Sequence, residues 1–173
     1  MSFAIRALTP DDWQMLRGMR LIALQTSPEV YLSTYEIAFL KTENDWKDML
    51  DGRGRCIFGL FDERRHIGIS GVFPFLEDIS GDTGFLGMSY IDPAYRGKGL
   101  STLFYQSRIA WAVKNTAWKK LVVSHRESNE PSRRAMAAHG FTFTHKKKIV
   151  WPDGVQDWDY NYSLDLTALR GAQ

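Results

Sequence analysis

The sequence predicts an α/β (α+β) fold, in which about seven strands form a mixed, mostly antiparallel central sheet with about four helices. Strand-like and helical segments alternate along the chain in the order β-α-α-β-β-β-α-β-α-β-β. No linker-like or low-complexity segment separates them. The 173 residues, of which 44% are hydrophobic, suit one core. We therefore expect a single domain that covers residues 1–173.

The first half of the chain predicts one strand, two helical segments and three further strands. Residues 3–8 alternate between apolar and polar side chains, as a strand does. Thr9 as N-cap, Pro10 as the first helical residue and Asp12 in the first turn begin a helix that ends before Pro28. Residues 29–52 are predicted to be mostly helical. The next three predicted strands are 55–62, 66–77 and 84–91.

The second half predicts two helices and three strands. A helix is expected over residues 100–114, a short strand over 119–125 and a second helix over 130–138, which Gly140 ends. Pro152-Asp153-Gly154 is typical of a tight turn. It predicts a hairpin between strands 141–151 and 155–166.

Charge and cysteine content limit the classes of function. The net charge of +2 comes from 22 basic and 20 acidic residues, so charge does not favour a nucleic-acid partner. The single cysteine, Cys56, allows no intrachain disulfide and fits a reducing, cytoplasmic compartment. No secretory signal, membrane-spanning run or Cys/His cluster with metal-ligand spacing is found. We expect no membrane association and no metal site.

The segment from Arg96 to Ser101 carries the strongest functional pattern. Gly97 and Gly99 alternate with Arg96 and Lys98 between a predicted strand and a predicted helix. Backbone N–H groups at a helix start bind anions, and glycines let a phosphate approach closely. The Walker and dinucleotide patterns do not fit, because their remaining glycine positions hold Asp92 and Thr102 respectively. The alternative is that the glycines only turn the chain.

Arg96-Gly97-Lys98-Gly99-Leu100-Ser101 resembles the signature Gln/Arg-x-x-Gly-x-Gly/Ala of the GCN5-related N-acetyltransferase (GNAT) superfamily, with Ser101 at the last small position. Asn129, followed eleven residues later by Gly140-Phe141, resembles a second element of that family. The resemblance implies a GNAT-like sheet that splays between its fourth and fifth strands. It also implies acetyl-CoA as co-substrate and an amine as acceptor.

The resemblance implies a cofactor site on both sides of the splay. The pyrophosphate would lie on the backbone of the glycine turn, and the pantetheine arm would lie along the edge of the fourth strand, with the thioester near Met88, Ser89 and Tyr90. The residues predicted to bind the cofactor are Ile91, Arg96, Gly97, Lys98, Gly99, Leu100, Ser101, Asn129 and Ser132.

The acid and base that many family members use are missing. The position of the family's tyrosine acid holds Met136, and two positions of its glutamate base hold Ser124 and Phe85. We predict Tyr90 as acid and His125 as base in their place. Tyr90 can instead be a packing residue of the sheet, and His125 a solvated or hydrogen-bonded histidine.

The acceptor is predicted to be an amine of a small molecule, peptide or protein. Aromatic and acidic side chains suit a cationic amine, and the residues predicted to line its site are Tyr31, Tyr35, Glu36 and Glu77. Two other functions stay open: an acyl-CoA-binding sensor with weak or no catalysis, which Met136 favours, and an unrelated phosphate-binding module. The sequence allows a monomer or a homodimer.

Overall fold

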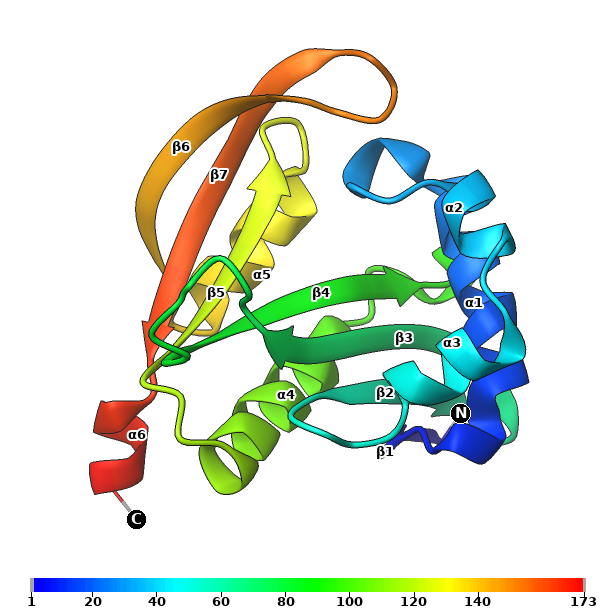
Figure 1. Ribbon diagram of the computed structural model, residues 1–173, viewed down its shortest axis with the longest axis horizontal. Helices are drawn as coiled ribbons and strands as arrows, with labels where there is room; N and C mark the ends of the chain where they lie inside the picture. Colours follow the sequence, from blue (N-terminus) through cyan, green and yellow to red (C-terminus); the bar gives the residue numbers. More distant parts are fainter. Residues whose placement is uncertain (1, 173) are drawn as a thin grey trace.

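The computed structural model describes residues 2–172, in which seven strands form one sheet in the order β1-β2-β3-β4-β5-β7-β6 (Figure 1). Every neighbouring pair is antiparallel except β4 and β5. The predicted mixed, mostly antiparallel sheet is confirmed. The strands are β1 (Phe3–Ala7), β2 (Cys56–Asp62), β3 (Arg65–Pro74), β4 (Thr83–Ile91), β5 (Lys120–Arg126), β6 (Thr142–Val150) and β7 (Gln156–Asp165).

Helices cover both faces of this sheet. One buried cluster joins α1, α2 and α3 to Ile57, Ile69 and Tyr90, and a second joins α4 and α5 to the opposite face. The α-helices are α1 (Trp13–Thr26), α2 (Tyr35–Phe39), α3 (Glu43–Met49), α4 (Ser101–Asn115), α5 (Glu130–Ala138) and α6 (Thr167–Gly171). Short 3-10 helices are η1 (Pro10–Asp12), η2 (Pro28–Val30) and η3 (Pro93–Tyr95). No helix within residues 2–172 has the length and apolar character needed to cross a membrane.

The fourth and fifth strands separate soon after they begin. Only Thr83–Phe85 of β4 pair with Lys120–Val122 of β5. Farther along, the β3–β4 register shifts between Ile69 and Gly71, and Met88 of β4 has a left-handed φ of 59°. This bulge bends β4 away from β5, and the two strands diverge in Figure 1. The predicted splay is confirmed.

The segment 29–52 differs from the mostly helical prediction, because it divides into η2, α2 and α3. Two threonines start the last two helices. Thr34 Oγ1 accepts a hydrogen bond from Ile37 N, and Thr42 forms a capping box with Asp45. The short helices leave η2 as a separate turn beside the end of β4, where Tyr31 Oη donates to Ser89 O over 2.8 Å. Helix α6 was not predicted.

Candidate active site

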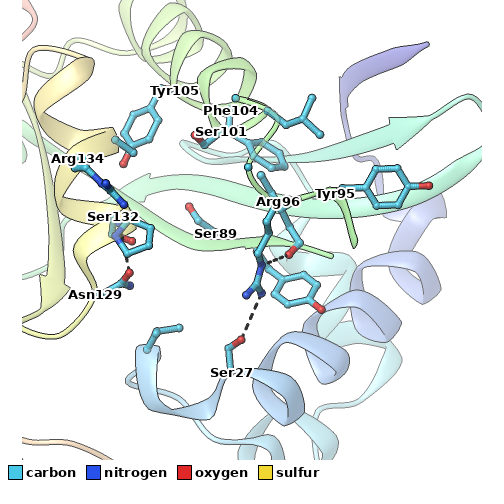
Figure 2. Close-up of a pocket in the computed structure, with 18 of the residues that line it drawn as sticks. Ser27, Ser89, Tyr95, Arg96, Ser101, Phe104, Tyr105, Asn129, Ser132 and Arg134 are labelled. Carbon is cyan, nitrogen blue, oxygen red and sulfur yellow. Dashed lines mark hydrogen bonds between the residues drawn. The ribbon is translucent and has the colours of Figure 1, made fainter. Parts of the chain in front are cut away.

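A cavity of about 600 Å³ lies where β4 and β5 separate (Figure 2). Its wall comes from four segments: the turn after α1, the end of β4, the turn that leads into α4, and the start of α5. In Figure 2, Ser89 of β4 lies between Arg96 on one side and Asn129 and Ser132 on the other. The cavity therefore extends from the glycine turn to the β4 bulge.

The glycine turn presents backbone at the start of α4. Gly97 and Gly99 have left-handed φ angles of 76° and 72°, and a Cβ at either position would meet no atom within 4 Å. The glycines are therefore required by backbone conformation and not by lack of space. Helix α4 begins at Ser101, which lines the cavity, so the partial positive charge of the helix start lies at this end. The next two N–H groups, of Thr102 and Leu103, donate to Gly99 O and Leu100 O over 3.1 Å each.

Two arginines add positive charge to this end. Arg96 donates from Nε to Ile91 O over 2.8 Å and from Nη2 to Ser27 Oγ over 3.5 Å, which fixes the guanidinium against the wall. Arg134 of α5 is exposed and lines the cavity on the side opposite Arg96. The donor set suits a polyanion such as a pyrophosphate. Lys98 is not among the lining residues and lies over the Tyr95 ring, 5.0 Å from its centroid.

Helix α5 begins beside the same cavity. Asn129 is its N-cap, and the Asn129 Oδ1 atom accepts a hydrogen bond from Ser132 N over 3.3 Å. Asn129 and Ser132 both line the cavity. The two predicted motifs, far apart in sequence, thus contribute to one site.

The β4 bulge is held from both faces of the sheet. Ser89 O accepts the hydrogen bond from Tyr31 on the α1 side. Ser89 Oγ lies 2.7 Å from Ser70 Oγ and accepts a hydrogen bond from Arg108 Nη1 of α4 over 3.1 Å. Burial raises the pKa of Tyr31 to about 12, so its phenol stays a neutral donor. The backbone at the bulge is therefore fixed where it meets the cavity.

The family model for the acetyltransferase (GNAT) family matches residues 17–141. The chain belongs to this family. Acetyl-CoA is the family's co-substrate, and the left-handed glycine turn, the α4 start, Arg96 and Arg134 fit its pyrophosphate. No curated protein sequence matches the chain.

Solved structures share the fold over nearly the full length of both chains. A GNAT acetyltransferase from Streptococcus pneumoniae has a TM-score of 0.81 at 17% identity, with coverage of 95% of this chain and 99% of that one. An N-acetyltransferase from Staphylococcus aureus Mu50 has a TM-score of 0.80 at 22% identity, with coverage of 96% and 99%. The yncA structure from Salmonella typhimurium, solved with its cofactor acetyl-CoA, has a TM-score of 0.80 at 17% identity, with coverage of 96% and 95%. These likenesses establish the GNAT fold.

Most of the predicted cofactor residues meet in the cavity. Lys98 is the member of the predicted set outside the lining, and the structure gives its ammonium a place over Tyr95. The predicted residues that line the cavity are Ile91, Arg96, Gly97, Gly99, Leu100, Ser101, Asn129 and Ser132.

The two predicted catalytic residues lie in different surroundings. Tyr90 lines the cavity, is 4% exposed, and accepts a hydrogen bond from Thr26 Oγ1 over 3.3 Å. His125 is buried outside the lining, where Nδ1 lies 2.7 Å from Arg126 O and Nε2 lies 3.1 Å from Tyr162 Oη. Both ring nitrogens of His125 have partners within the protein. The structure therefore places Tyr90 at the cavity and His125 in the hydrogen-bonded interior.

The predicted acceptor residues also separate. Tyr31 lines the cavity. Tyr35 stacks on Phe39 with ring centroids 5.8 Å apart, and Glu36 is exposed in the first turn of α2. Glu77 is exposed in the turn after β3. The last three do not line the cavity.

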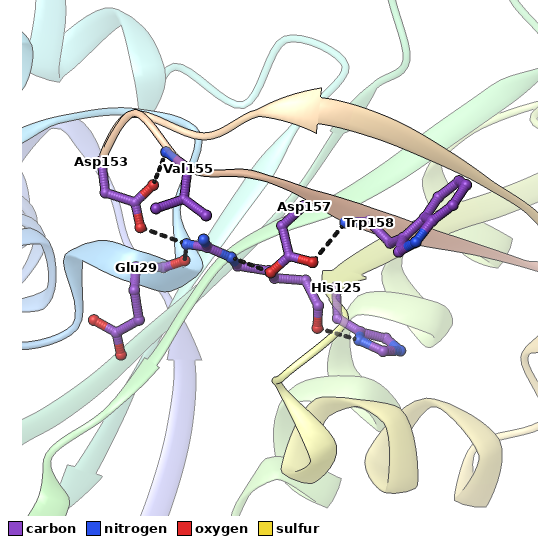
Figure 3. A network of polar contacts seen from close by, with 7 residues as sticks. Glu29, His125, Asp153, Val155, Asp157 and Trp158 are labelled. Carbon is purple, nitrogen blue, oxygen red and sulfur yellow. Dashed lines mark hydrogen bonds and ion pairs between the residues drawn. The ribbon is translucent and has the colours of Figure 1, made fainter.

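Glu29, which the sequence did not single out, is the one acidic residue among the described cavity-lining residues. Its turn is held by Arg126, at the end of β5, and Figure 3 labels Glu29, Asp153 and Asp157, which Arg126 joins. Arg126 Nη1 donates to Glu29 O over 3.1 Å and to Asp153 Oδ2 over 2.6 Å, and Nε donates to Asp157 Oδ2 over 2.9 Å. These bonds join the turn to the β6–β7 hairpin. Hydrogen bonds from the guanidinium lower the pKa of both aspartates.

Tyr105 and Arg108 of α4 are further lining residues outside the predicted set. Tyr105 is buried, and its ring stacks on His139 with centroids 4.3 Å apart. The sequence contained a signal for the burial of Arg108, because this residue lies four positions from both Phe104 and Ala112. That spacing places a charged side chain on the apolar stripe of its helix. Glu29 and Arg126 gave no such signal, since only the fold brings them together.

Proposed function

We propose that this chain is an acetyl-CoA-dependent N-acetyltransferase that moves an acetyl group to a primary amine by direct attack of the amine on the thioester. The observation that supports it is one cavity that joins three parts: the glycine turn, the β4 bulge and the acidic turn at Glu29. Binding both reactants in this cavity makes the transfer effectively unimolecular. The acceptor is a small molecule or an amine of a peptide or protein.

Different residues along the cavity bind the cofactor and orient its thioester. Backbone N–H groups from Gly97 to Ser101 hold the pyrophosphate, with Arg96 beside them. Acetyl-CoA, when bound, supplies an activated acyl group as a thioester. Polar backbone at the fixed β4 bulge orients the carbonyl and stabilises its negative charge in the transition state. Asn129 and Ser132 complete the opposite wall.

Glu29 and Tyr31 define the acceptor end. An amine with a pKa of ~10.4 is less than ~0.1% neutral at pH 7, so it must lose a proton before attack. The Glu29 carboxylate attracts the ammonium form and takes up the proton directly or through water. Tyr31 supplies an aromatic wall, and its ring already contacts a cation of the protein, because the Arg20 guanidinium carbon lies 4.6 Å from its centroid. Glu36, Tyr35 and Glu77 remain predictions as acceptor residues.

Tyr90 is proposed as the acid because it is the predicted catalytic residue at the cavity. The role of His125 as base remains a prediction, and its hydrogen bonds to Arg126 O and Tyr162 favour a positioning role for the end of β5. Met136, buried in the α5 core cluster at the family's acid position, favours the second candidate function, an acyl-CoA-binding sensor.

Isothermal titration calorimetry with acetyl-CoA, with ATP as the control ligand, tests the cofactor assignment. We expect micromolar-range binding of acetyl-CoA and much weaker binding of ATP. Equal binding of both ligands would support a general phosphate site instead. A panel of cationic amines, assayed for release of free CoA, then separates the enzyme from the sensor, because the sensor binds acetyl-CoA without turnover.

A further inference from the structure

Arg108 is a buried cation at the wall of the cavity. Its side chain comes from α4, it is 1% exposed, and it lines the cavity. None of the ion pairs found among residues 2–172 includes it. Burial lowers its pKa to about 10, which still leaves the guanidinium charged at neutral pH. A buried charge without an anionic partner is costly to a fold.

The guanidinium is held toward the β4 bulge. Arg108 Nε donates to Phe104 O over 3.1 Å, and Nη1 donates to Ser89 Oγ over 3.1 Å. The guanidinium carbon lies 4.7 Å from the centroid of the Tyr105 ring. These contacts fix the direction of the charge but provide no negative charge. The partner that would compensate the charge of Arg108 is therefore an anion bound in the cavity.

The position of Arg108 indicates which anion this is. Ser101, at the glycine turn, and Arg108 are seven residues apart in α4, a rise of about 10 Å along the helix. The pyrophosphate end already has Arg96 and the α4 N-terminus. Arg108 instead reaches Ser89, at the bulge where the thioester is expected. The negative charge that arises there during acetyl transfer belongs to the departing sulfur.

We propose that Arg108 is the counter-ion of the acyl donor's sulfur and that it stabilises this sulfur as a thiolate. The inference rests on the proposed function. As the amine nitrogen bonds to the carbonyl carbon, the carbon–sulfur bond breaks and its electron pair stays on sulfur, while the amine proton goes to Glu29 or water. Arg108 lowers the energy of this charge separation without donating a proton. It thereby replaces part of the role of the tyrosine acid whose family position holds Met136 in this chain.

The thiol of bound CoA provides a direct test, with desulfo-CoA, which lacks the sulfur, as reference. We expect the thiol pKa in the complex to lie at least about one pH unit below that of free CoA, since an opposite charge in contact lowers the pKa of an acid by ~1–3. Thiolate ultraviolet absorbance up to pH 9 measures it, and the desulfo-CoA complex corrects for ionising tyrosines. The other titratable or charged lining groups are Glu29, Tyr31, Tyr90, Tyr95, Arg96, Tyr105 and Arg134.

Calorimetry provides a second readout. If the bound thiol has the lower pKa, CoA binding strengthens as pH rises from the bound to the free thiol pKa, about tenfold for each pH unit that separates the two values. Desulfo-CoA binding should lack this increase. In Arg108→Met, the thiol pKa and the pH dependence should return to the values of free CoA. Lys114→Met, which removes an exposed cation of the same helix outside the cavity lining, should keep the lowered thiol pKa.

The outcomes separate this inference from the proposed function. If neither CoA nor desulfo-CoA binds, the cofactor assignment fails. If both bind but the wild-type thiol titrates as in free CoA, Arg108 is not the counter-ion, and an acid such as Tyr90 is favoured. Desulfo-CoA binding and circular dichroism check that Arg108→Met is folded. Arg108→Lys keeps the charge and should retain a lowered thiol pKa, while the value of free CoA in that variant would contradict the electrostatic role.

Discussion

The two ends of the cavity are built differently. At the phosphate end, one short segment from Arg96 to Ser101 supplies the backbone, the charge and the helix start. At the acceptor end, the turn with Glu29 is held by Arg126 of β5 together with Asp153 and Asp157 of the hairpin. Glu29 and Arg126 are 97 positions apart in the chain. The first end is a local structure, and the second depends on the assembled sheet.

This difference explains why the phosphate end resembles a family signature while the acceptor end does not. A glycine turn that requires left-handed φ angles at Gly97 and Gly99 constrains residue types at fixed spacing. A turn held through its backbone carbonyl, as at Glu29 O, leaves the side chain of that residue free to vary. The acceptor end is therefore the part of the fold in which specificity can change while the cofactor site is kept.

The largest effect is expected at the phosphate end, from Gly99→Asp. Gly99 has a φ of 72°, which strains other residues, and the new carboxylate would repel the pyrophosphate. We expect acetyl-CoA affinity, measured by calorimetry, to fall about 100-fold, or about 2.7 kcal/mol. Gly54→Asp is the matched control, since Gly54 has a φ of 67° and lies outside the cavity. Parental affinity in Gly99→Asp would show that the turn does not bind the cofactor.

The sequence predicted the local features well. Asn129 is the N-cap of α5 as well as a cavity residue, and Asp153-Gly154 form the hairpin turn, with Gly154 at a φ of 81°. These features depend on nearby residues. The splay between β4 and β5 was available only through the family resemblance, because the left-handed residue of the bulge is Met88 and not a glycine.

The acceptor residues were harder to predict for a physical reason. Tyr35 and Glu36 have the residue types that suit a cationic amine, but Thr34 starts a separate helix that directs them away from the cavity lining. His125 ends a predicted strand near the site, yet Tyr160 and Tyr162 of β7 stack on its ring. Periodicity places a residue on an element, whereas the cavity is decided by which elements pack together.

The acceptor end is tested by comparing Glu29→Gln with Glu36→Gln. Loss of the Glu29 carboxylate should raise the KM for a cationic amine up to about fivefold, the scale of one exposed charge contact. It should also lower kcat, because glutamine cannot take up the amine proton. The Kd for acetyl-CoA should stay unchanged, because the phosphate end is separate. Glu36 is an exposed glutamate outside the cavity, so its variant should behave as the parent. The reverse pattern, with an effect only at Glu36, would restore the sequence-based prediction and remove Glu29 from the site.

The smallest expected effect concerns the stability of the hairpin contact in acid. Arg126 lowers the pKa of Asp153 and Asp157 in the folded state. A carboxyl group with a lowered folded pKa contributes stability above its unfolded pKa of ~3.9, and this contribution is lost as pH falls through the folded value. The Asp153→Asn/Asp157→Asn double variant lacks this contribution, so its melting temperature should lie below that of the parent at pH 7 and approach it near pH 3.

Because both carboxylates are partly exposed, we expect a difference of only about 2–4 °C at pH 7. Glu130→Gln, which removes an exposed carboxylate paired with Arg133 on α5, serves as the control and should change the melting temperature less. A pH-independent difference in the double variant would mean that the aspartates act through the shape of the hairpin. A difference that disappears in acid would show that charge on Arg126 and its partners joins the acceptor turn to the sheet.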